Sequence, residues 1–287
     1  DGTGYARRKL RLHVAGCDAA QRDRVWLRHA DHSEDGTCRH DAQHCRHIPR
    51  IDRRFVPGAK VFVGSTTLSN EYTVSKQNKV RQLREKAAYD QETVHAILDA
   101  GLVAHVGFVQ DGAAVVVPML YGRDGETLYL HGARKARVIR LLESTGAACI
   151  NVTLLDGLVF ARSAFASSMN YRSVTVYGKA RLVDDWEDKK QALHVIAECT
   201  MPGRRAELRK STDNELKMTG VIAVDIDSAS AKISVGMPED EDIDLDTPVW
   251  AGVLPLESRF TTLQPDDLVQ EGVEPSDALK AMENTKL

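Results

Sequence analysis

The sequence lacks the short motifs by which several large enzyme classes are recognised. It contains no Gly-x-Ser-x-Gly nucleophile elbow, no phosphate-binding P-loop and no Gly-rich dinucleotide fingerprint. It also offers no pair of carboxylates at a plausible active site. These absences argue against a serine hydrolase of the elbow type, a P-loop nucleotide hydrolase and a dehydrogenase with a Gly-rich dinucleotide-binding turn.

Long apolar runs and an ordered set of cysteines are missing as well. No run of about 18 apolar residues occurs, so the sequence predicts no transmembrane helix and no membrane partner. No secretory signal peptide is recognisable. The cysteines are odd in number and irregularly spaced, which favours a reducing compartment over a disulfide framework, and we predict a cytoplasmic protein. The five are Cys17, Cys38, Cys45, Cys149 and Cys199.

Charge is unevenly distributed along the 287 residues. The formal net charge is −3, with +4 over residues 1–54 and −7 over the remainder. Neither balance requires a nucleic acid partner, and we predict none. Residues 1–65 combine an Arg bias with weak apolar periodicity, so we expect a poorly structured or non-native N-terminal extension. A basic targeting presequence is the alternative, against which the eight acids before residue 55 argue.

Six of the ten histidines lie in this extension, and three of them form a cluster with two cysteines. The pattern Cys38-x-His40-x-x-x-His44-Cys45-x-His47 contains metal-ligand residue types. Structural zinc sites usually pair two ligands and then two more across an intervening loop, whereas this cluster is compressed. We therefore predict no native metal site, with metal or partner binding by this segment as the alternative.

Three Asp-Gly pairs, each between apolar runs, predict tight hairpin turns, because Asp-Gly suits a turn in which both residues have positive φ. Consecutive hairpins make an antiparallel meander, which closes into a small barrel when enough strands are present. The sequence therefore predicts a mainly β fold with peripheral α-helices. The pairs, with the runs that each is expected to join, are Asp111-Gly112 (103–110 and 113–121), Asp124-Gly125 (113–121 and 126–131) and Asp156-Gly157 (147–155 and 158–165).

Capping residues and periodicity predict the other elements. Alternating apolar and polar residues predict a long strand over 171–183, and two more strands are expected over 221–227 and 231–235. The acidic stretch 239–246 is expected to be a solvated connector. Helices are expected over 90–100 with Gly101 as the stop, over 133–142 and 186–200, after the Thr212-x-x-Glu215 capping box, and from Ser276.

The segment 131–137 combines a strand end with a basic helix start. We place the end of the strand at residue 131 and the start of the helix near residue 133. Free N–H groups and the positive dipole end at a helix start favour an anion, and Arg grips phosphate with two parallel hydrogen bonds. The segment is therefore a candidate phosphate site, with an ordinary solvated turn as the alternative. Its residues are His131, Gly132, Ala133, Arg134, Lys135 and Arg137.

Three further features of the sequence each allow a functional and a structural interpretation. Proline cannot donate to a sheet ladder, so Pro118 predicts an edge, a bulge or the end of pairing, where open backbone groups could meet a flat ligand; an edge strand without a ligand is the alternative. His105, inside an apolar run, is expected to be a hydrogen-bonded core residue rather than a catalyst. An amide, a phenol and a guanidinium precede the long strand, either as ligand contacts or as a plain surface loop: Asn170, Tyr171 and Arg172.

Together these segments resemble the pyridoxamine 5′-phosphate oxidase-like superfamily of FMN-binding split barrels, and within it the flavin-nucleotide-binding branch related to nitroimidazole-resistance proteins. The resemblance covers roughly residues 72–256 and leaves the extension and the polar C-terminal tail 257–287 unexplained. Its motifs are Ala104-His105-Val106-Gly107-Phe108, Val117-Pro118-Met119-Leu120-Tyr121, Leu130-His131-Gly132-Ala133, Asn170-Tyr171-Arg172-Ser173-Val174 and Trp250-Ala251-Gly252-Val253-Leu254-Pro255-Leu256.

The resemblance implies a homodimer with FMN at the subunit interface. Residues 131–133 and Arg137 would reach the ribityl phosphate. Many relatives have small residues where this chain has Arg134 and Lys135. A substrate-phosphate site like that of the true pyridoxamine phosphate oxidases is not recognisable here. The isoalloxazine would be lined through backbone contacts by Pro118, Met119, Leu120 and Tyr121.

The activity that the resemblance implies is that of an FMN-dependent oxidoreductase. Reduced nicotinamide would supply electrons to a small organic acceptor or to oxygen, and the flavin would carry the redox chemistry. The same barrel in relatives holds haem or a deazaflavin. A non-catalytic flavin- or haem-binding sensor or carrier is therefore the alternative, since fold does not settle function.

Overall fold

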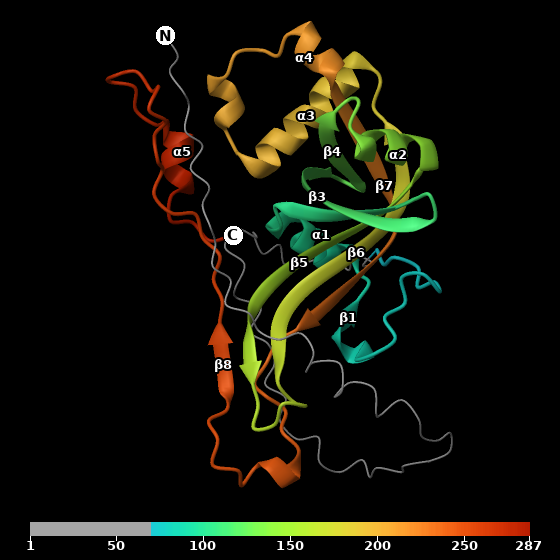
Figure 1. Ribbon diagram of the computed structural model, residues 1–287, viewed down its shortest axis with the longest axis vertical. Helices are drawn as coiled ribbons and strands as arrows, with labels where there is room; N and C mark the ends of the chain where they lie inside the picture. The colour runs from blue at the N-terminus through green and yellow to red at the C-terminus, as the bar shows by residue number, and fades with distance from the viewer. Residues whose placement is uncertain (1–69) are drawn as a thin grey trace, which may run out of the picture. The chain divides into compact units, whose positions relative to one another are not determined.

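The first two Asp-Gly pairs lie at hairpins, as the sequence predicts. In the computed structural model, which describes residues 70–287, strands β2 (Val103–Gln110), β3 (Ala113–Asp124) and β4 (Thr127–Ala133) make two successive antiparallel pairs (Figure 1). Asp111 and Gly112 have φ of 51° and 78°, the positive pair that a tight turn of this kind needs. The second turn is displaced by one residue from the prediction: Asp124 still belongs to β3 and pairs with Thr127, so Gly125 and Glu126 make that turn.

The meander closes into a barrel. β5 (Ala147–Phe160) pairs with β2, β6 (Ser168–Leu182) pairs with β5, and β7 (Thr219–Ser234) pairs with both β6 and β4, all antiparallel. The strand order β7-β4-β3-β2-β5-β6 thus returns to β7. Two short strands, β1 (Ala87–Ala88) and β8 (Gly252–Pro255), add to β7 and β5. The predicted mainly β fold is confirmed.

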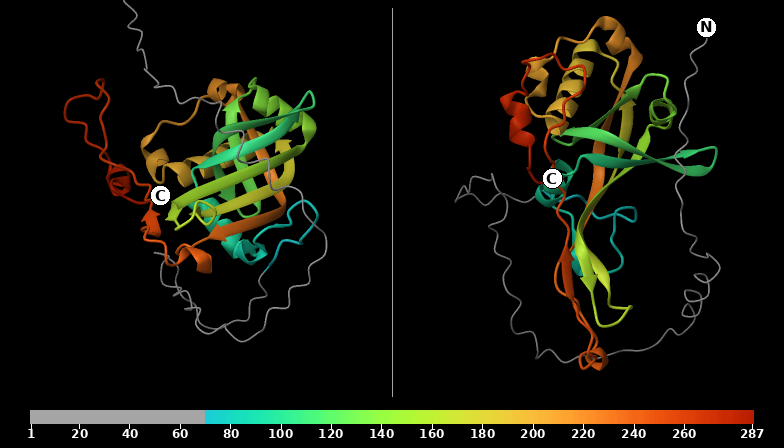
Figure 2. Two further views of the ribbon diagram at one scale, coloured as in Figure 1. Left: turned by 60° about the horizontal axis from the view of Figure 1, so that its bottom comes forward. Right: turned by 60° about the vertical axis from the view of Figure 1, so that its left-hand side comes forward.

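Five α-helices accompany the barrel in the described residues (Figures 1 and 2). Asp90 caps the first by accepting a hydrogen bond from the backbone N–H of Thr93. The capping box predicted at Thr212 and Glu215 is present. The helices are α1 (Gln91–Ala100), α2 (Arg137–Thr145), α3 (Trp186–Thr200), α4 (Asp213–Met218) and α5 (Asp277–Met282), with 3-10 turns η2 (Arg84–Lys86), η3 (Arg204–Glu207) and η4 (Asp242–Asp244).

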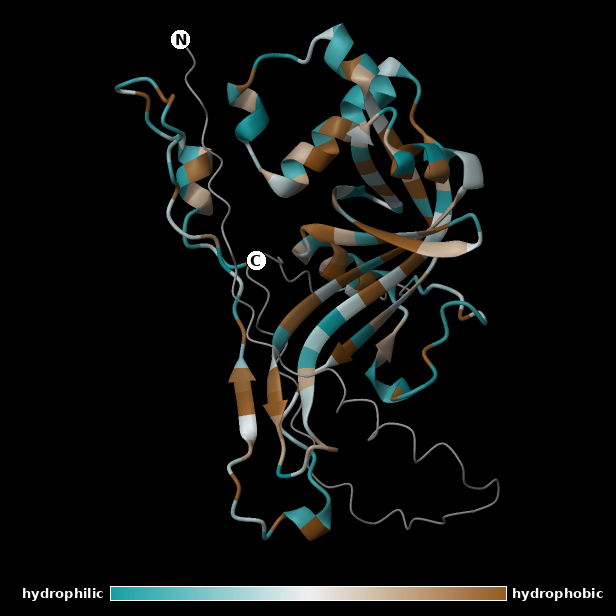
Figure 3. Ribbon diagram, in the orientation of Figure 1, coloured by the Kyte–Doolittle hydropathy of each residue, from teal (hydrophilic) through white to brown (hydrophobic). Residues whose placement is uncertain are grey.

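Period-two alternation places the core inside the barrel. On β6, Val174 and Val176 are fully buried, whereas Lys179 and Arg181 farther along the strand are exposed. Figure 3 shows bands of brown, white and teal along β6. The amphipathic helix α2 adds its apolar face to the same core through Ile139, which has no exposed surface.

The third Asp-Gly pair does not form a turn, and that prediction was wrong. β5 continues through Asp156 and Gly157 without a turn. It forms a bulge there, as the shift in its register with β6 between Leu155 and Gly157 shows. The glycine serves a close approach: a Cβ on Gly157 would lie 2.9 Å from the carbonyl oxygen of Leu254 on β8. A neighbouring strand far along the chain therefore decides the conformation of this pair.

Three other boundaries differ from the prediction. β4 continues to Ala133, which pairs with Thr219 on β7, so α2 begins only at Arg137. β6 begins at Ser168 rather than at residue 171. β7 is one strand rather than two, and it takes up an irregularity in its pairing with β6 instead of breaking.

The acidic stretch 239–246 is more than a solvated connector. Asp240 accepts hydrogen bonds from the backbone N–H and the guanidinium of Arg162 at 2.6 and 2.7 Å, and its side chain is 2 % exposed. A buried carboxylate held in this way anchors the stretch to the residues that follow β5.

Among residues 70–287, no helix is long and apolar enough to cross a lipid bilayer. The same residues contain no group of three or more His, Cys, Asp or Glu side chains placed to hold a metal ion. The His/Cys pattern at residues 38–47 and the predicted extension 1–65 lie outside the described residues.

Candidate functional site

The barrel has an open seam between β3 and β4. The two strands pair from Asp124 and Thr127 as far as Tyr121 and Leu130. Past that point residues 118–120 pair only with β2, and residues 131–133 pair only with β7. Backbone groups on the facing sides of these segments therefore have no strand partner within residues 70–287. The seam unites two segments that the sequence singles out, and it makes Pro118 the local edge that was expected.

The turn after β4 enters α2 without a side-chain cap. The N-cap residue is Ala136, no side chain accepts a hydrogen bond from the first turn, and that turn holds no acid. Lys135 and Arg137 are exposed and make no ion pair with residues 70–287. Free N–H groups at a helix start attract anions, whereas cations there are unfavourable unless an anion is present. The start of α2 is therefore suited to a phosphate.

Arg134 differs from these two cations, because it already has a partner. Its guanidinium donates two hydrogen bonds to Glu143 on α2, at 3.0 and 3.1 Å. Its backbone N–H donates to the carbonyl of Met218, at 2.7 Å. Arg134 thus fastens α2 to the end of α4, and most of the free positive charge at this place belongs to Lys135 and Arg137.

His131 is the first residue of β4 that no longer pairs with β3, so it lies at the start of the seam, and its side chain is half-buried. The Nδ1 atom is buried and has no hydrogen-bond partner among the described residues. Burial lowers the pKa of the imidazole, which favours the neutral ring at neutral pH. A buried nitrogen without a partner costs free energy, so a ligand group that reached it would gain a hydrogen bond.

The side chains of residues 119–121 alternate across β3. Tyr121 is 3 % exposed, and its hydroxyl donates to the carbonyl of Leu98 at the end of α1. Burial raises the pKa of Tyr121. The phenol belongs to the core, so only the backbone of Tyr121 faces the seam. Met119 packs against the core as well, whereas Leu120 is 43 % exposed.

The residues before the predicted long strand lie on β6 itself. The amide of Asn170 donates to the carbonyl of Gly236 at 3.0 Å. The guanidinium of Arg172 donates two hydrogen bonds to Asp156, at 3.0 and 2.7 Å. Tyr171 between them pairs with β5 and β7 and is partly buried.

Within one subunit, residues 170–172 do not lie beside the His131 side of the seam. His131 pairs with Val221, whose carbonyl accepts a hydrogen bond from the N–H of Val183 just past β6. Arg172 comes before Val183 by roughly 35 Å of extended chain, at about 3.3 Å per residue, so residues 170–172 are remote from His131. On the other side of the seam Arg172 is nearer, because it lines the same groove as His105, the β2 neighbour of Pro118. The predicted site residues therefore form two groups within the subunit.

A groove of about 430 Å³ lies where β2 and β5 part. His105 lines it and is exposed, so the expectation of a core histidine was wrong. The alternation on β2 buries Ala104 and Val106 and turns His105 outward. Arg172 and Lys286 also line the groove, among mainly apolar neighbours.

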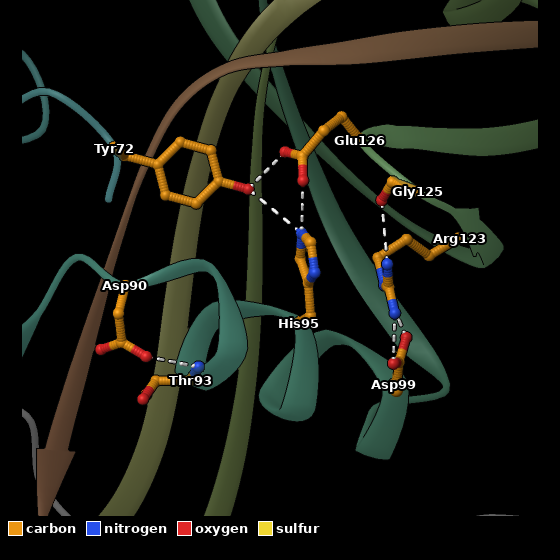
Figure 4. A network of polar contacts seen from close by, with 8 residues as sticks. All are labelled: Tyr72, Asp90, Thr93, His95, Asp99, Arg123, Gly125 and Glu126. Carbon is orange, nitrogen blue, oxygen red and sulfur yellow. Dashed lines mark hydrogen bonds and ion pairs between the residues drawn. The ribbon is translucent and has the colours of Figure 1, made fainter. Parts of the chain in front are cut away.

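Figure 4 shows a polar cluster that sequence reasoning missed. The hydroxyl of Tyr72 donates to Glu126 at 2.6 Å, and Nε2 of His95 lies 2.9 Å from the other carboxylate oxygen. Beside them Arg123 donates two hydrogen bonds to Asp99. Burial, followed by the carboxylate, raises the pKa of Tyr72. The cluster ties the segment before α1 to the β3–β4 turn, and no spacing marks it because its members come from distant parts of the chain.

The strands return to β7 and so close an antiparallel barrel, but β3 and β4 separate over part of their length. These two features define a split β-barrel protein. The family model described as pyridoxamine 5′-phosphate oxidase matches residues 90–233, which is half of the chain. The chain therefore belongs to the pyridoxamine 5′-phosphate oxidase family, as its motifs predicted. A search of curated proteins gives no match.

Solved structures are similar to this chain over most of its length. A flavocytochrome from Azotobacter vinelandii is 36 % identical over 74 % of this chain and 98 % of its own, with a TM-score of 0.70. A FAD- and haem-binding protein from Mycobacterium smegmatis is 36 % identical over 69 % of this chain and 98 % of its own, with a TM-score of 0.67. A putative 5-nitroimidazole antibiotic resistance protein from Bacteroides thetaiotaomicron is 25 % identical over 51 % and 86 %, with a TM-score of 0.45.

Proposed function

We propose that this chain is a flavin-binding redox protein, with a flavin nucleotide in the β3–β4 seam. The observation that carries the proposal is the convergence of three features: open backbone along the seam, the uncapped start of α2 beside Lys135 and Arg137, and the unpartnered Nδ1 of His131. A flat ring suits an open strand edge, and a phosphate suits a helix start. Membership of the family supports the same assignment.

The residues present fit such a ligand. Backbone groups of residues 118–121 would contact the isoalloxazine, and residues 131–133 with Arg137 would hold the ribityl phosphate. Bound flavin would supply the redox chemistry, and the protein positions it and tunes its electronics. FMN and FAD share these two parts. The motifs favour FMN, whereas the relative from Mycobacterium smegmatis binds FAD, so the mass of the released cofactor decides between them.

We further propose a homodimer, because the predicted site residues form two separated groups within one subunit. A symmetric partner would bring Asn170 and Tyr171 of its own β6 towards the seam. Exposed apolar residues on the adjoining ends of β5, β6 and β8 support an interface there, and Figure 3 shows β8 and the end of β5 in brown. They include Leu158, Phe160, Met169 and Leu254. A monomer that carries bound flavin in light scattering at micromolar concentration would contradict this proposal.

The proposed reaction is oxidoreduction, with reduced nicotinamide as the electron donor and a small organic molecule or oxygen as the acceptor, in the cytoplasm. The test is to purify the protein and record its visible spectrum for the two bands of oxidised flavin. Anaerobic mixing with reduced nicotinamide should bleach the longer-wavelength band, and addition of oxygen should restore it. If dithionite reduces the bound flavin but reduced nicotinamide does not, the proposed enzymatic activity is contradicted and a flavin carrier is favoured.

Haem binding is a second candidate, favoured by the two structures at 36 % identity, a flavocytochrome and a FAD- and haem-binding protein. The β2–β5 groove offers an exposed imidazole, apolar walls and two cations, Arg172 and Lys286, whose carboxylate partners Asp156 and Glu257 also line it. We propose that the chain holds haem in addition to flavin. Titration of the purified protein with haemin should give a saturable Soret change; free haemin spectra throughout would refute it.

A further inference from the structure

The β2–β5 groove is a cleft that the flavin seam does not use. Residues 105–107 of β2 pair with residues 149–151 of β5, and on the α1 side of His105 the two strands part. Residues 256–258 and the two last residues, Lys286 and Leu287, form an outer wall. This wall is held together, because the N–H of Leu287 donates to the carbonyl of Ser258 at 2.9 Å and Lys286 pairs with Glu257. The volume of about 430 Å³ lies in the range of cofactor sites.

His105 is the histidine that this groove offers. Its side chain makes no hydrogen bond within residues 70–287, so its ring nitrogens are available to a ligand. The other three histidines of the described chain lie elsewhere. His95 is bound to Glu126, His131 lies at the flavin seam, and His194 lies on α3 beside Glu198.

The walls of the groove suit a flat apolar macrocycle with two carboxylates. Val103, Leu155 and Leu256 line it with 44, 38 and 48 % of their surface exposed, which a bound ring would cover. Arg172 donates hydrogen bonds to Asp156 from Nε and Nη2, and its Nη1 has no partner among the described residues. The Lys286 ammonium has three N–H donors and gives one to Glu257, so Arg172 and Lys286 each keep a donor beyond their carboxylate partners, which also line the groove.

We propose that His105 is an axial ligand of a haem bound in the β2–β5 groove. An imidazole nitrogen of His105 would bind the iron, the apolar side chains would contact the macrocycle, and the remaining donors of Arg172 and Lys286 would reach the propionates. This inference rests on the haem binding proposed above and adds its position and its ligand. His105 lies directly opposite Pro118 on β3, with Cα atoms about 5 Å apart. The ligand is therefore next to the segment proposed for the flavin.

The test uses the full-length protein titrated with haemin, read by absorption and electron paramagnetic resonance spectra rather than by activity. The wild type should show a histidine-ligated spectrum. His105→Ala should lose that spectrum, and added imidazole should restore it, because a free imidazole can occupy the position of the missing side chain. His105→Met should retain haem with a shifted Soret band and a raised reduction potential.

A matched variant and a stability measurement separate ligation from general damage. His194→Ala, on α3 and outside the groove lining, should keep the wild-type haem spectrum. The thermal unfolding midpoint of His105→Ala without haemin should equal that of the wild type, since His105 is exposed. If the wild type binds no haem, the haem proposal fails and this inference fails with it. If the wild type binds haem and His105→Ala keeps an unchanged spectrum, haem binding stands and the ligand is wrong.

Discussion

Arg172 holds Asp156 through two parallel hydrogen bonds at the residue where β5 bulges, and the two side chains are 39 % and 35 % exposed. A bulge bends its strand and increases the local twist. The ion pair therefore fixes the place from which β5, β6 and β8 extend away from the barrel (Figure 2).

Replacing Arg172 with Ala should lower the free energy of unfolding by about 0.5–1 kcal/mol, since a half-exposed ion pair is screened by solvent. Arg172→Lys should recover little of this loss, because an ammonium cannot match the two-point geometry. Urea unfolding gives the measurement. Arg181, which makes one contact of 3.3 Å to Asp225, is the control and should be nearly neutral. Equal losses at both positions would show that the bulge needs no clamp.

Replacing Arg137 with Ala should weaken FMN binding by about tenfold to a hundredfold, because a hydrogen bond to a charged group contributes about 1.5–3 kcal/mol. Riboflavin lacks the phosphate, so its affinity should stay the same. Lys135→Ala should act in the same direction. Flavin fluorescence titration measures all of these, and Arg181→Ala serves as the control. Equal weakening for FMN and riboflavin would place the phosphate elsewhere.

The stability of the protein should depend on pH through His131. Its folded pKa is lowered from 6.5 by burial, so the unfolded chain takes up the proton more readily. The stabilising contribution is thus fully present above about pH 6.5 and is lost as the pH falls through the folded pKa. Thermal unfolding at a series of pH values should show a steeper loss for the wild type than for His131→Gln. Parallel curves for the wild type and His131→Gln would contradict the assignment.

Replacing Gly122 with Ala should destabilise the contact between β3 and α3. A Cβ there would lie 2.7 Å from the Cα of Ile196, and backbone atoms do not move aside cheaply. The expected loss is about 1–3 kcal/mol in the free energy of unfolding. Gly132→Ala is the matched control, because the nearest atom to its Cβ would be Ile139 Cγ1 at 3.5 Å, and it should fold normally. A stable Gly122→Ala variant would mean that α3 shifts freely.

Replacing Tyr72 with Phe leaves the ring in place but removes the hydroxyl, which donates to the Glu126 carboxylate at 2.6 Å and lies 3.2 Å from Nε2 of His95. The expected cost is about 1.5 kcal/mol, the lower end for a hydrogen bond to a charged group. Denaturant unfolding measures it. Tyr129→Phe is the control, since the Tyr129 hydroxyl makes no hydrogen bond within residues 70–287. A loss no larger than that of the control would show that His95 alone satisfies Glu126.

Local signals in the sequence were sufficient where one element determines its own ends. Asp90 and Thr212 predict their helices because a capping side chain acts within a single turn. Local signals failed where a strand far along the chain determines the conformation, as at Gly157, which packs closely against β8. The single strand β7 was divided in the prediction for the same reason, since pairing with β4 and β6 keeps it continuous.

The candidate site was predicted in the same uneven way. The seam residues 118–121 and 131–133 stand out because Pro118 and the basic turn have local meaning. His105 was placed in the core because β2 is apolar on both faces, so alternation gave no direction: Val103 and Val109 point outward and are 44 and 60 % exposed. The separation of residues 170–172 from the seam follows from register alone, which a single sequence does not display.

The position of β7 has a consequence for how the protein is made. β7 is the last long strand to leave the ribosome, yet it lies between β4 and β6 and also pairs with β1. Until residue 234 has emerged, the nascent chain keeps two unpaired strand edges and a half-covered apolar core. Biosynthesis of this barrel therefore ends in a single late closing step, and a chain that stalls before it is a natural client for chaperones.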